Sequence, residues 1–372
     1  MAKKVITRGK FDKLQQLSND KGVIAALAID QRGSMKKMMK AADEKEGASY
    51  SLDQIYTFKE LVSKELTKYA SAILTDEELG FKAMTAKDPS SGLILSYEKT
   101  GYDVTTVGRF PELLHGESID RLAAKGADAV KVLVYYNPHD KDEINNEKHA
   151  FVERLGNEAR GADMPLFLEV VTYDDNVPDA KSLEYAKEKP SLVLDSMKEF
   201  TKAKYGVDVL KAEVPVNWDF VEGHTAPGVK AAYTEDEAAK YFQEFNKVVD
   251  RPFIYLSAGV SAETFREELN FAGKAGNKYN GILCGRATWR DGIEVMAKDG
   301  QAGFAVLGRA TWRDGIEVMA KDGEAGLTKW LETTGKQNVE ELNSILDTYA
   351  KPWYEWYGGL DNIDVVDPVV TK

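Results

Sequence analysis

Eight short aliphatic runs recur along this chain of 372 residues, and they alternate with longer segments that have helical spacing. Short buried strands that alternate with helices are typical of a parallel β/α architecture. Eight is also the strand count of the (β/α)8 barrel, which we therefore predict, with additional helices near the C-terminus. An open, doubly wound sheet is the competing fold, but no GxGxxG follows the first run to support its dinucleotide-binding form. The runs are 23–30, 71–76, 92–98, 129–135, 166–171, 207–214, 253–259 and 281–285.

Helix boundaries are marked by capping residues. The patterns S-x-x-Q at 51–54 and T-x-x-E at 234–237 each predict a capping box at a helix start. Ser261 is expected to cap a third helix, and Gly126 and Gly206 stand where helices should stop before a new strand.

Composition narrows the class of protein. The chain has one cysteine, Cys284, which excludes an internal disulfide and is expected to be a small core residue. The net charge of −12 disfavours a general nucleic-acid-binding surface. No run approaches the roughly 18 apolar residues of a membrane span, and the basic N-terminus lacks the apolar core of a signal peptide. The four histidines show no metal-ligand spacing. We expect a cytoplasmic protein with no membrane or nucleic-acid partner.

One segment is duplicated. The sequence GRATWRDGIEVMAKDG occupies residues 285–300 and recurs unchanged at 308–323, an offset of 23 residues. Such identity indicates a recent tandem duplication or an engineered sequence rather than a drifting solenoid repeat. Only one copy can supply the eighth strand and its loop, and we favour the first over the second. We expect one barrel domain over 1–350, including the duplicated segment 285–323, and a C-terminal tail over 351–372.

Charged residues interrupt three of the aliphatic runs. Lys131, Glu169 and Lys211 each lie among Val and Leu residues. Side chains of a strand alternate between two faces. In each run the more aliphatic face should pack against helices, and the charged residue lies on the other face. Asp30 follows the same rule in the first run. We therefore expect these four side chains inside the barrel, near the carboxyl ends of its strands, where such barrels carry their active sites.

A lysine in this setting is a candidate nucleophile. Burial disfavours the ammonium form, and a second lysine nearby lowers the pKa further. The neutral amine of Lys211 could then attack a carbonyl to form a Schiff base, while Glu169 shuttles protons. Lys131 could depress that pKa or hold a substrate hydroxyl or phosphate. The structural alternative is a buried ion-pair network, Lys131–Glu169 and Lys211–Glu213, but so many buried charges are costly without a function.

Two loops suggest a phosphate site. Ser257 and the Gly259 amide follow the seventh strand and open a helix, and Gly285 and Arg286 follow the eighth. This is the usual location of a phosphate in such barrels. If the second copy fills the eighth strand, Gly308 and Arg309 take these places.

Other polar turns are weaker candidates. Gln31 and Arg32 could reach a second phosphate, or they could belong to a solvated loop, and the turn at 97–99 is similar. His224 could face the site but is as readily explained as a surface residue.

Several motifs occur together, in order and at natural spacing. Together they resemble the class I tagatose 1,6-bisphosphate aldolases of the LacD type, over about residues 23–349. The motifs are A-x-D-Q-R-G at 28–33, S-Y-E-K-T-G-Y at 96–102, G-A-D-A-V-K-x-L-x-Y-Y at 126–136, G-V-D-V-L-K-x-E-V-P-V at 206–216, Y-L-S-A-G-V-S at 255–261 and C-G-R-A-T-W at 284–289.

The resemblance implies a barrel that cleaves D-tagatose 1,6-bisphosphate into dihydroxyacetone phosphate and D-glyceraldehyde 3-phosphate, in lactose and galactose catabolism, without metal or cofactor. By position, Lys211 would form the Schiff base and Glu169 would be the acid/base, assisted by Asp30 and Lys131. Ser257, Gly259 and Arg286 would bind phosphate. The small-molecule partner would be a sugar phosphate, and we expect a homo-oligomer, a dimer.

Three alternatives stay open. A relative of this type could act on fructose bisphosphate or on a sulfofructose phosphate. A non-catalytic barrel could bind sugar phosphates only. A magnesium-dependent barrel enzyme could use Asp30, Asp76 and Glu169.

Overall fold

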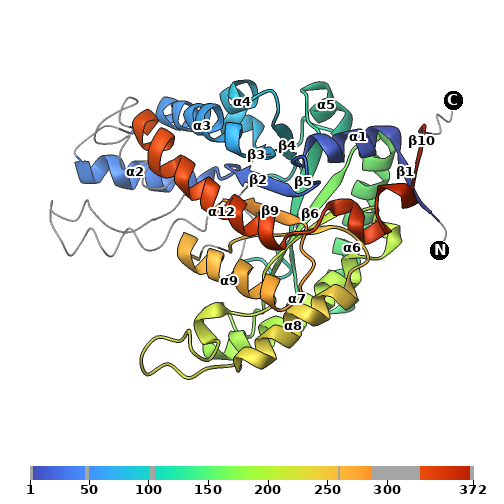
Figure 1. Ribbon diagram of the computed structural model, residues 1–372. Helices are drawn as coiled ribbons and strands as arrows, with labels where there is room; N and C mark the ends of the chain where they lie inside the picture. The colour runs from blue at the N-terminus through green and yellow to red at the C-terminus, as the bar shows by residue number, and fades with distance from the viewer. Residues whose placement is uncertain (1–2, 47–49, 101–104, 259, 286–326, 369–372) are drawn as a thin grey trace.

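The barrel predicted from the eight runs is confirmed. The computed structural model describes residues 3–46, 50–100, 105–258, 260–285 and 327–368 (Figure 1). Eight parallel strands close in chain order, and the last pairs with the first, with Gly281 opposite Ile24. The barrel strands are β2 (Ile24–Ala28), β3 (Ala72–Thr75), β4 (Gly92–Ser96), β5 (Ala129–Tyr136), β6 (Leu166–Thr172), β7 (Val209–Ala212), β8 (Phe253–Tyr255) and β9 (Gly281–Cys284).

The eighth barrel strand lies directly before the first copy of the duplicated sequence. β9 ends at Cys284, and the first copy begins at Gly285. The eighth barrel strand is thus the run that leads into the first copy. The rest of the duplicated segment lies outside the described residues.

Helices cover the outside of the barrel (Figure 1). Both predicted capping boxes are present, at Ser51 and Thr234, and the Ser261 hydroxyl accepts a hydrogen bond from the Thr264 amide at 3.0 Å. The helices are α1 (Arg8–Gln16), α2 (Gly33–Glu46), α3 (Leu52–Leu66), α4 (Glu77–Ala86), α5 (Ile119–Ala124), α6 (Asp142–Gly161), α7 (Leu183–Phe200), α8 (Glu235–Val248), α9 (Ala262–Lys274) and α12 (Lys336–Tyr349). No helix among these described residues is both long and apolar enough to cross a membrane.

The amino-terminal end of the barrel is closed by both chain ends. β1 (Lys4–Thr7) pairs in parallel with β10 (Ile363–Val366), so the two ends of the chain lie side by side (Figure 1). The fully buried Trp353, in the 3₁₀ helix η5 (Trp353–Tyr357), belongs to the same apolar cluster as Leu14, Leu17 and the inward side chains of the barrel. Residues 351–366 of the expected tail therefore pack as part of the barrel floor. The polar candidate residues lie at the opposite end of the barrel, where the strands have their carboxyl ends.

Candidate active site

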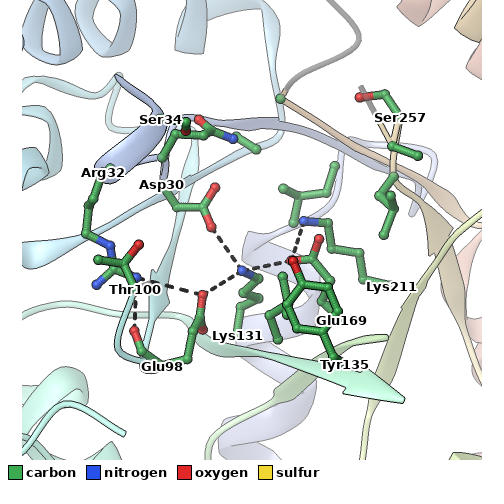
Figure 2. A pocket seen from close by; sticks show the side chains of 18 of the residues that line it. Asp30, Arg32, Ser34, Glu98, Thr100, Lys131, Tyr135, Glu169, Lys211 and Ser257 are labelled. Atoms are coloured by element: carbon green, nitrogen blue, oxygen red, sulfur yellow. Dashed lines mark hydrogen bonds and ion pairs between the residues drawn. The ribbon is translucent and has the colours of Figure 1, made fainter. Parts of the chain in front are cut away.

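A cavity of about 290 Å³ opens at the carboxyl ends of the strands (Figure 2). Parallel strands all end on this side, so side chains that follow different strands converge there. The candidates for Schiff-base chemistry and phosphate binding that the structure describes all line the cavity: Asp30, Gln31, Arg32, Lys131, Glu169, Lys211, Ser257 and Gly285. The remaining candidates, Gly259, Arg286, Gly308 and Arg309, lie outside the described residues.

Strand register brings Lys211 to Glu169. The two residues are direct partners in the β6–β7 ladder, and because paired residues share a face, both side chains point inward. The Lys211 Nζ lies 2.8 Å from the Glu169 Oε2. Burial and the positive charge of Lys131 lower the pKa of Lys211, although Glu169 opposes them. A lowered pKa makes the neutral, nucleophilic amine accessible.

Lys131 stands at the centre of the cavity floor (Figure 2). Its Nζ lies 2.9 Å from the Asp30 Oδ2, 2.7 Å from the Glu98 Oε1 and 2.8 Å from the Glu169 Oε2. Burial by itself would lower its pKa, but Asp30, Glu169 and Glu98 together outweigh this and raise the pKa of Lys131 well above its usual value. Lys131 is therefore a permanent ammonium group.

The three carboxyl groups around Lys131 have different pKa values. Burial would raise all three, but the nearby lysines outweigh it at Asp30 and Glu169 and hold their pKa values below the usual range. At Glu98, burial, together with the negative charge of Asp30, outweighs Lys131 and Arg32 and raises the pKa. Of the three carboxyl groups around Lys131, Glu98 is therefore the one that takes up a proton most readily.

The predicted pair Lys211–Glu213 is not formed. The Glu213 Oε2 instead accepts hydrogen bonds from the Thr172 amide and hydroxyl, both at 2.7 Å. The reason is that β7 ends at Ala212, so regular alternation stops before Glu213. The other predicted pair, Lys131–Glu169, is present.

Arg32 is buried rather than part of a solvated loop. Only 3% of it is exposed, and its Nη2 donates to the Glu98 carbonyl oxygen at 2.9 Å. It therefore bridges the loop after β2 to the end of β4, on the wall of the cavity.

The magnesium ligand set considered from the sequence does not assemble. Asp76 does not line the cavity: its carboxylate pairs with the buried Lys59 and caps α4 by accepting from the Leu79 amide. Within the described ranges, no group of three or more His, Cys, Asp or Glu residues is arranged to hold a metal ion.

Two lesser candidates lie away from the cavity. His224 does not line it: its ring packs at a tilt against Trp218, with centroids 4.2 Å apart, and lines a separate surface groove between α8 and α9. Cys284 is 2% exposed and packs in the core, as expected.

Glu98 was predicted only as part of the weak candidate turn at 97–99. Ser96 is the ladder partner of Lys131 and so shares its inward face. Glu98 lies two residues further along, on the same face, and lines the cavity. Alternation counted from Ser96 could have identified it. Tyr135 lies four residues after Lys131 in β5, on the same strand face, and it also lines the cavity.

Comparisons with known proteins identify the family of the chain. The family model described as DeoC/LacD family aldolase matches residues 24–291. A tagatose 1,6-diphosphate aldolase of Listeria monocytogenes is 51% identical over 97% of this chain and 98% of the relative. Tagatose 1,6-diphosphate aldolase 2 of Enterococcus faecalis is 50% identical over 94% of this chain and 97% of its own. A solved fructose-bisphosphate aldolase of Plasmodium falciparum shares the fold, with a TM-score of 0.60 at 15% identity, covering 94% of this chain and 98% of that one. The chain belongs to the DeoC/LacD aldolase family.

Proposed function

We propose that this aldolase is a class I, Schiff-base enzyme that cleaves D-tagatose 1,6-bisphosphate into dihydroxyacetone phosphate and D-glyceraldehyde 3-phosphate. The observation that carries the mechanism is Lys211, a buried lysine with a lowered pKa whose Nζ lies 2.8 Å from Glu169. The substrate is the one named for the relatives from Listeria and Enterococcus.

The proposed reaction begins at Lys211. Its neutral amine attacks the C2 ketone, and loss of water gives an iminium ion that can accept electrons. A base removes the proton of the C4 hydroxyl, the C3–C4 bond breaks, and its electron pair passes to the iminium to form an enamine. The C4–C6 half leaves as the aldehyde. Protonation of the enamine at C3 and hydrolysis then release dihydroxyacetone phosphate and restore the amine.

The neighbouring charges suit the proton transfers. Glu169 contacts both lysines, so it can take the amine proton of Lys211 and return protons during formation and hydrolysis of the iminium. Lys131 remains an ammonium, so it can stabilise oxyanions that develop on the substrate, and it holds Asp30 beside the cavity.

Phosphate binding is proposed at the polar residues of the cavity that follow different strands. These are Gln31, Arg32, Ser257 and Gly285, of which Gly285 lies beside the Gln31 side chain. The assignment of Gly259 and Arg286, or of Gly308 and Arg309, to the same role stays a prediction from the sequence. A cytoplasmic homodimer without a cofactor also stays a prediction.

Reductive trapping tests the proposal. Incubation with dihydroxyacetone phosphate and sodium borohydride should add the mass of one reduced adduct to the wild-type chain, because hydride fixes the iminium as a stable amine. Lys211→Met should give no adduct, and peptide mapping should locate the label at Lys211 rather than at Lys131. An adduct on Lys131, or one that persists in Lys211→Met, would refute the assignment. Phosphate-ligand binding without any adduct would support the non-catalytic barrel instead.

Substrate choice needs a separate measurement. Tagatose bisphosphate, fructose bisphosphate and a sulfofructose phosphate should be compared by kcat/KM in one assay. We expect the tagatose compound to have the highest value; a higher value for either competitor would reassign the substrate and leave the mechanism intact.

A further inference from the structure

The guanidinium group of Arg109 packs on two tyrosine rings beside the active-site cavity. Arg109 belongs to the connection between β4 and α5, and its Cζ lies 4.2 Å from the ring centroid of Tyr173 and 5.7 Å from that of Tyr135. The two rings meet edge to face, with centroids 6.4 Å apart. The Arg109 Nη2 also lies 2.9 Å from the Asp175 Oδ1, and its side chain is only 16% exposed. A cation is attracted to an aromatic face, more strongly where water is excluded.

The backbone at Arg109 has a conformation that is unfavourable by itself. Its φ is 43°, in the left-handed region that residues other than glycine rarely adopt, and Gly108 before it has a φ of 92°. The Arg109 Nε is buried and has no hydrogen-bond partner in the part of the chain that the structure describes. A strained backbone and an unpaired buried donor persist only where other contacts hold the group in place. The two rings and Asp175 supply such contacts.

Tyr135 connects these contacts to the active site. It lies in β5 on the same face as Lys131, and it lines the cavity (Figure 2). Arg109 does not line the cavity itself. Of the three residues that its guanidinium group contacts in these interactions, Tyr135 is the one that belongs to the cavity wall.

The other tyrosine has anchors of its own. The Tyr173 hydroxyl donates to the Asp140 Oδ2 at 2.5 Å and accepts from the Lys148 Nζ at 3.0 Å. Tyr173 is 4% exposed, whereas Tyr135 is half-buried. Loss of the Arg109 guanidinium should therefore leave Tyr173 in place and release mainly the ring of Tyr135.

We propose that Arg109 is a positioning residue, which holds the Tyr135 ring in the wall of the active-site cavity and thereby supports cleavage of the sugar phosphate. The consequence for cleavage rests on the proposed Schiff-base function, whereas the place of the ring does not. Arg109 thus joins the connection between β4 and α5 to the strand that carries Lys131.

A double-mutant cycle tests this route from Arg109 through Tyr135. Arg109→Met removes the charge but keeps a long side chain. Tyr135→Leu removes the aromatic face, and Tyr135→Phe keeps that face without the hydroxyl. Arg121→Met is the matched control, because Arg121 is an exposed arginine in α5 whose Nη1 donates to the Gly116 carbonyl oxygen.

Each variant is assayed for kcat/KM with tagatose bisphosphate. The values are expressed per site that traps dihydroxyacetone phosphate on borohydride reduction, so that unfolded chains are not counted. Crystal structures of the wild type and of Arg109→Met show separately where the Tyr135 ring lies.

The effect of Arg109→Met should depend on the ring at position 135. Alone it should lower kcat/KM by about 3- to 10-fold, the range that corresponds to one partly buried cation–π contact. The loss should be similar in the Tyr135→Phe background and less than about twofold in Tyr135→Leu, where the ring is absent. Arg121→Met should match wild type. In the crystal structure of Arg109→Met, the Tyr135 ring should be displaced while Tyr173 keeps its contacts.

Three results would overturn the inference. A Tyr135 ring that keeps its place in Arg109→Met would show that Arg109 does not position it. A displaced ring with unchanged kcat/KM would show that cleavage does not need this position. Losses that multiply in the Arg109→Met, Tyr135→Leu double variant would show that Arg109 acts by another route. Failure of the proposed function would look different, because the wild-type chain would trap no triose, and the crystal structures would still decide where the ring lies.

Discussion

At the scale of single residues, neighbouring charges give the two lysines of the site opposite pKa shifts. Lys131 and Lys211 both lie 2.8 Å from the same oxygen of Glu169. Lys131 has two further carboxyl groups in contact and its pKa rises, whereas Lys211 has none of these ion pairs and the pKa falls. The local count of opposite charges thus decides which amine is permanently charged and which can become a nucleophile.

Another buried carboxyl group leads to a prediction about pH. Glu268 in α9 is 2% exposed, and burial raises its pKa to about 8, with Lys189 opposing. The folded chain therefore keeps a proton that the unfolded chain releases near the ordinary value of 4.5. Stability should then fall as the pH rises from 4.5 to 8. Glu268→Gln removes this loss and should stabilise the protein at pH 9 by at most about 5 kcal/mol.

Thermal unfolding at pH 5 and pH 9 checks this expectation. The gain in Tm of Glu268→Gln over wild type should be present at pH 9 and small at pH 5. Glu263→Gln changes an exposed carboxylate of the same helix and should leave Tm nearly unchanged at both pH values. An equal gain for Glu268→Gln at both pH values would show that the effect does not come from its titration.

At the scale of secondary-structure elements, close packing of α6 on the segment before β7 depends on one glycine. A Cβ added to Gly156 would lie 1.9 Å from the carbonyl oxygen of Tyr205, a backbone atom that cannot rotate away. Gly156→Ala should therefore destabilise the protein by about 1–3 kcal/mol through overpacking.

Gly161 in the same helix is the matched control. Nothing lies within 4 Å of the position its Cβ would take. Gly161→Ala should be neutral, or stabilising by up to about 1 kcal/mol through reduced freedom of the unfolded chain. The two free energies of unfolding come from urea denaturation, and similar values for the two variants would contradict the packing argument.

The elements also show what sequence could and could not predict. Aliphatic runs and capping boxes are local signals, so all eight barrel strands and the starts of α3 and α8 were predicted. Alternation predicted the inward faces of Lys131, Glu169 and Lys211. It failed beyond the end of β7, where Glu213 received the wrong partner. Glu98 does follow the alternation from Ser96, but it was predicted only as part of a weak candidate turn. Which side chain binds which beyond a strand end depends on loop paths that periodicity does not encode.

At the scale of the whole molecule, the two chain ends are joined far from the active site. β1 pairs with β10, the Trp353 Nε1 donates to the Gln15 Oε1 at 3.0 Å, and the Trp353 amide donates to the Gly22 carbonyl oxygen at 2.9 Å. These contacts link residues more than three hundred positions apart, so no local pattern could reveal them. For this reason the sequence predicts a tail over 351–372, although much of this segment packs on the barrel.

Removing this segment should therefore destabilise the barrel without altering its chemistry. A chain that ends at Ala350 loses the fully buried Trp353 and the partner strand of β1. Trp353→Ala alone should cost about 3–5 kcal/mol, and the truncation should cost more. A chain that ends at Pro368 keeps every described contact of η5 and β10 and serves as the control. The urea midpoint should be highest for the chain that ends at Pro368, lower for Trp353→Ala and lowest for the chain that ends at Ala350. Borohydride trapping by the folded fraction should stay unchanged, because the segment and the cavity lie at opposite ends of the strands. Equal midpoints for the two truncated chains would show that the segment is a dispensable tail after all.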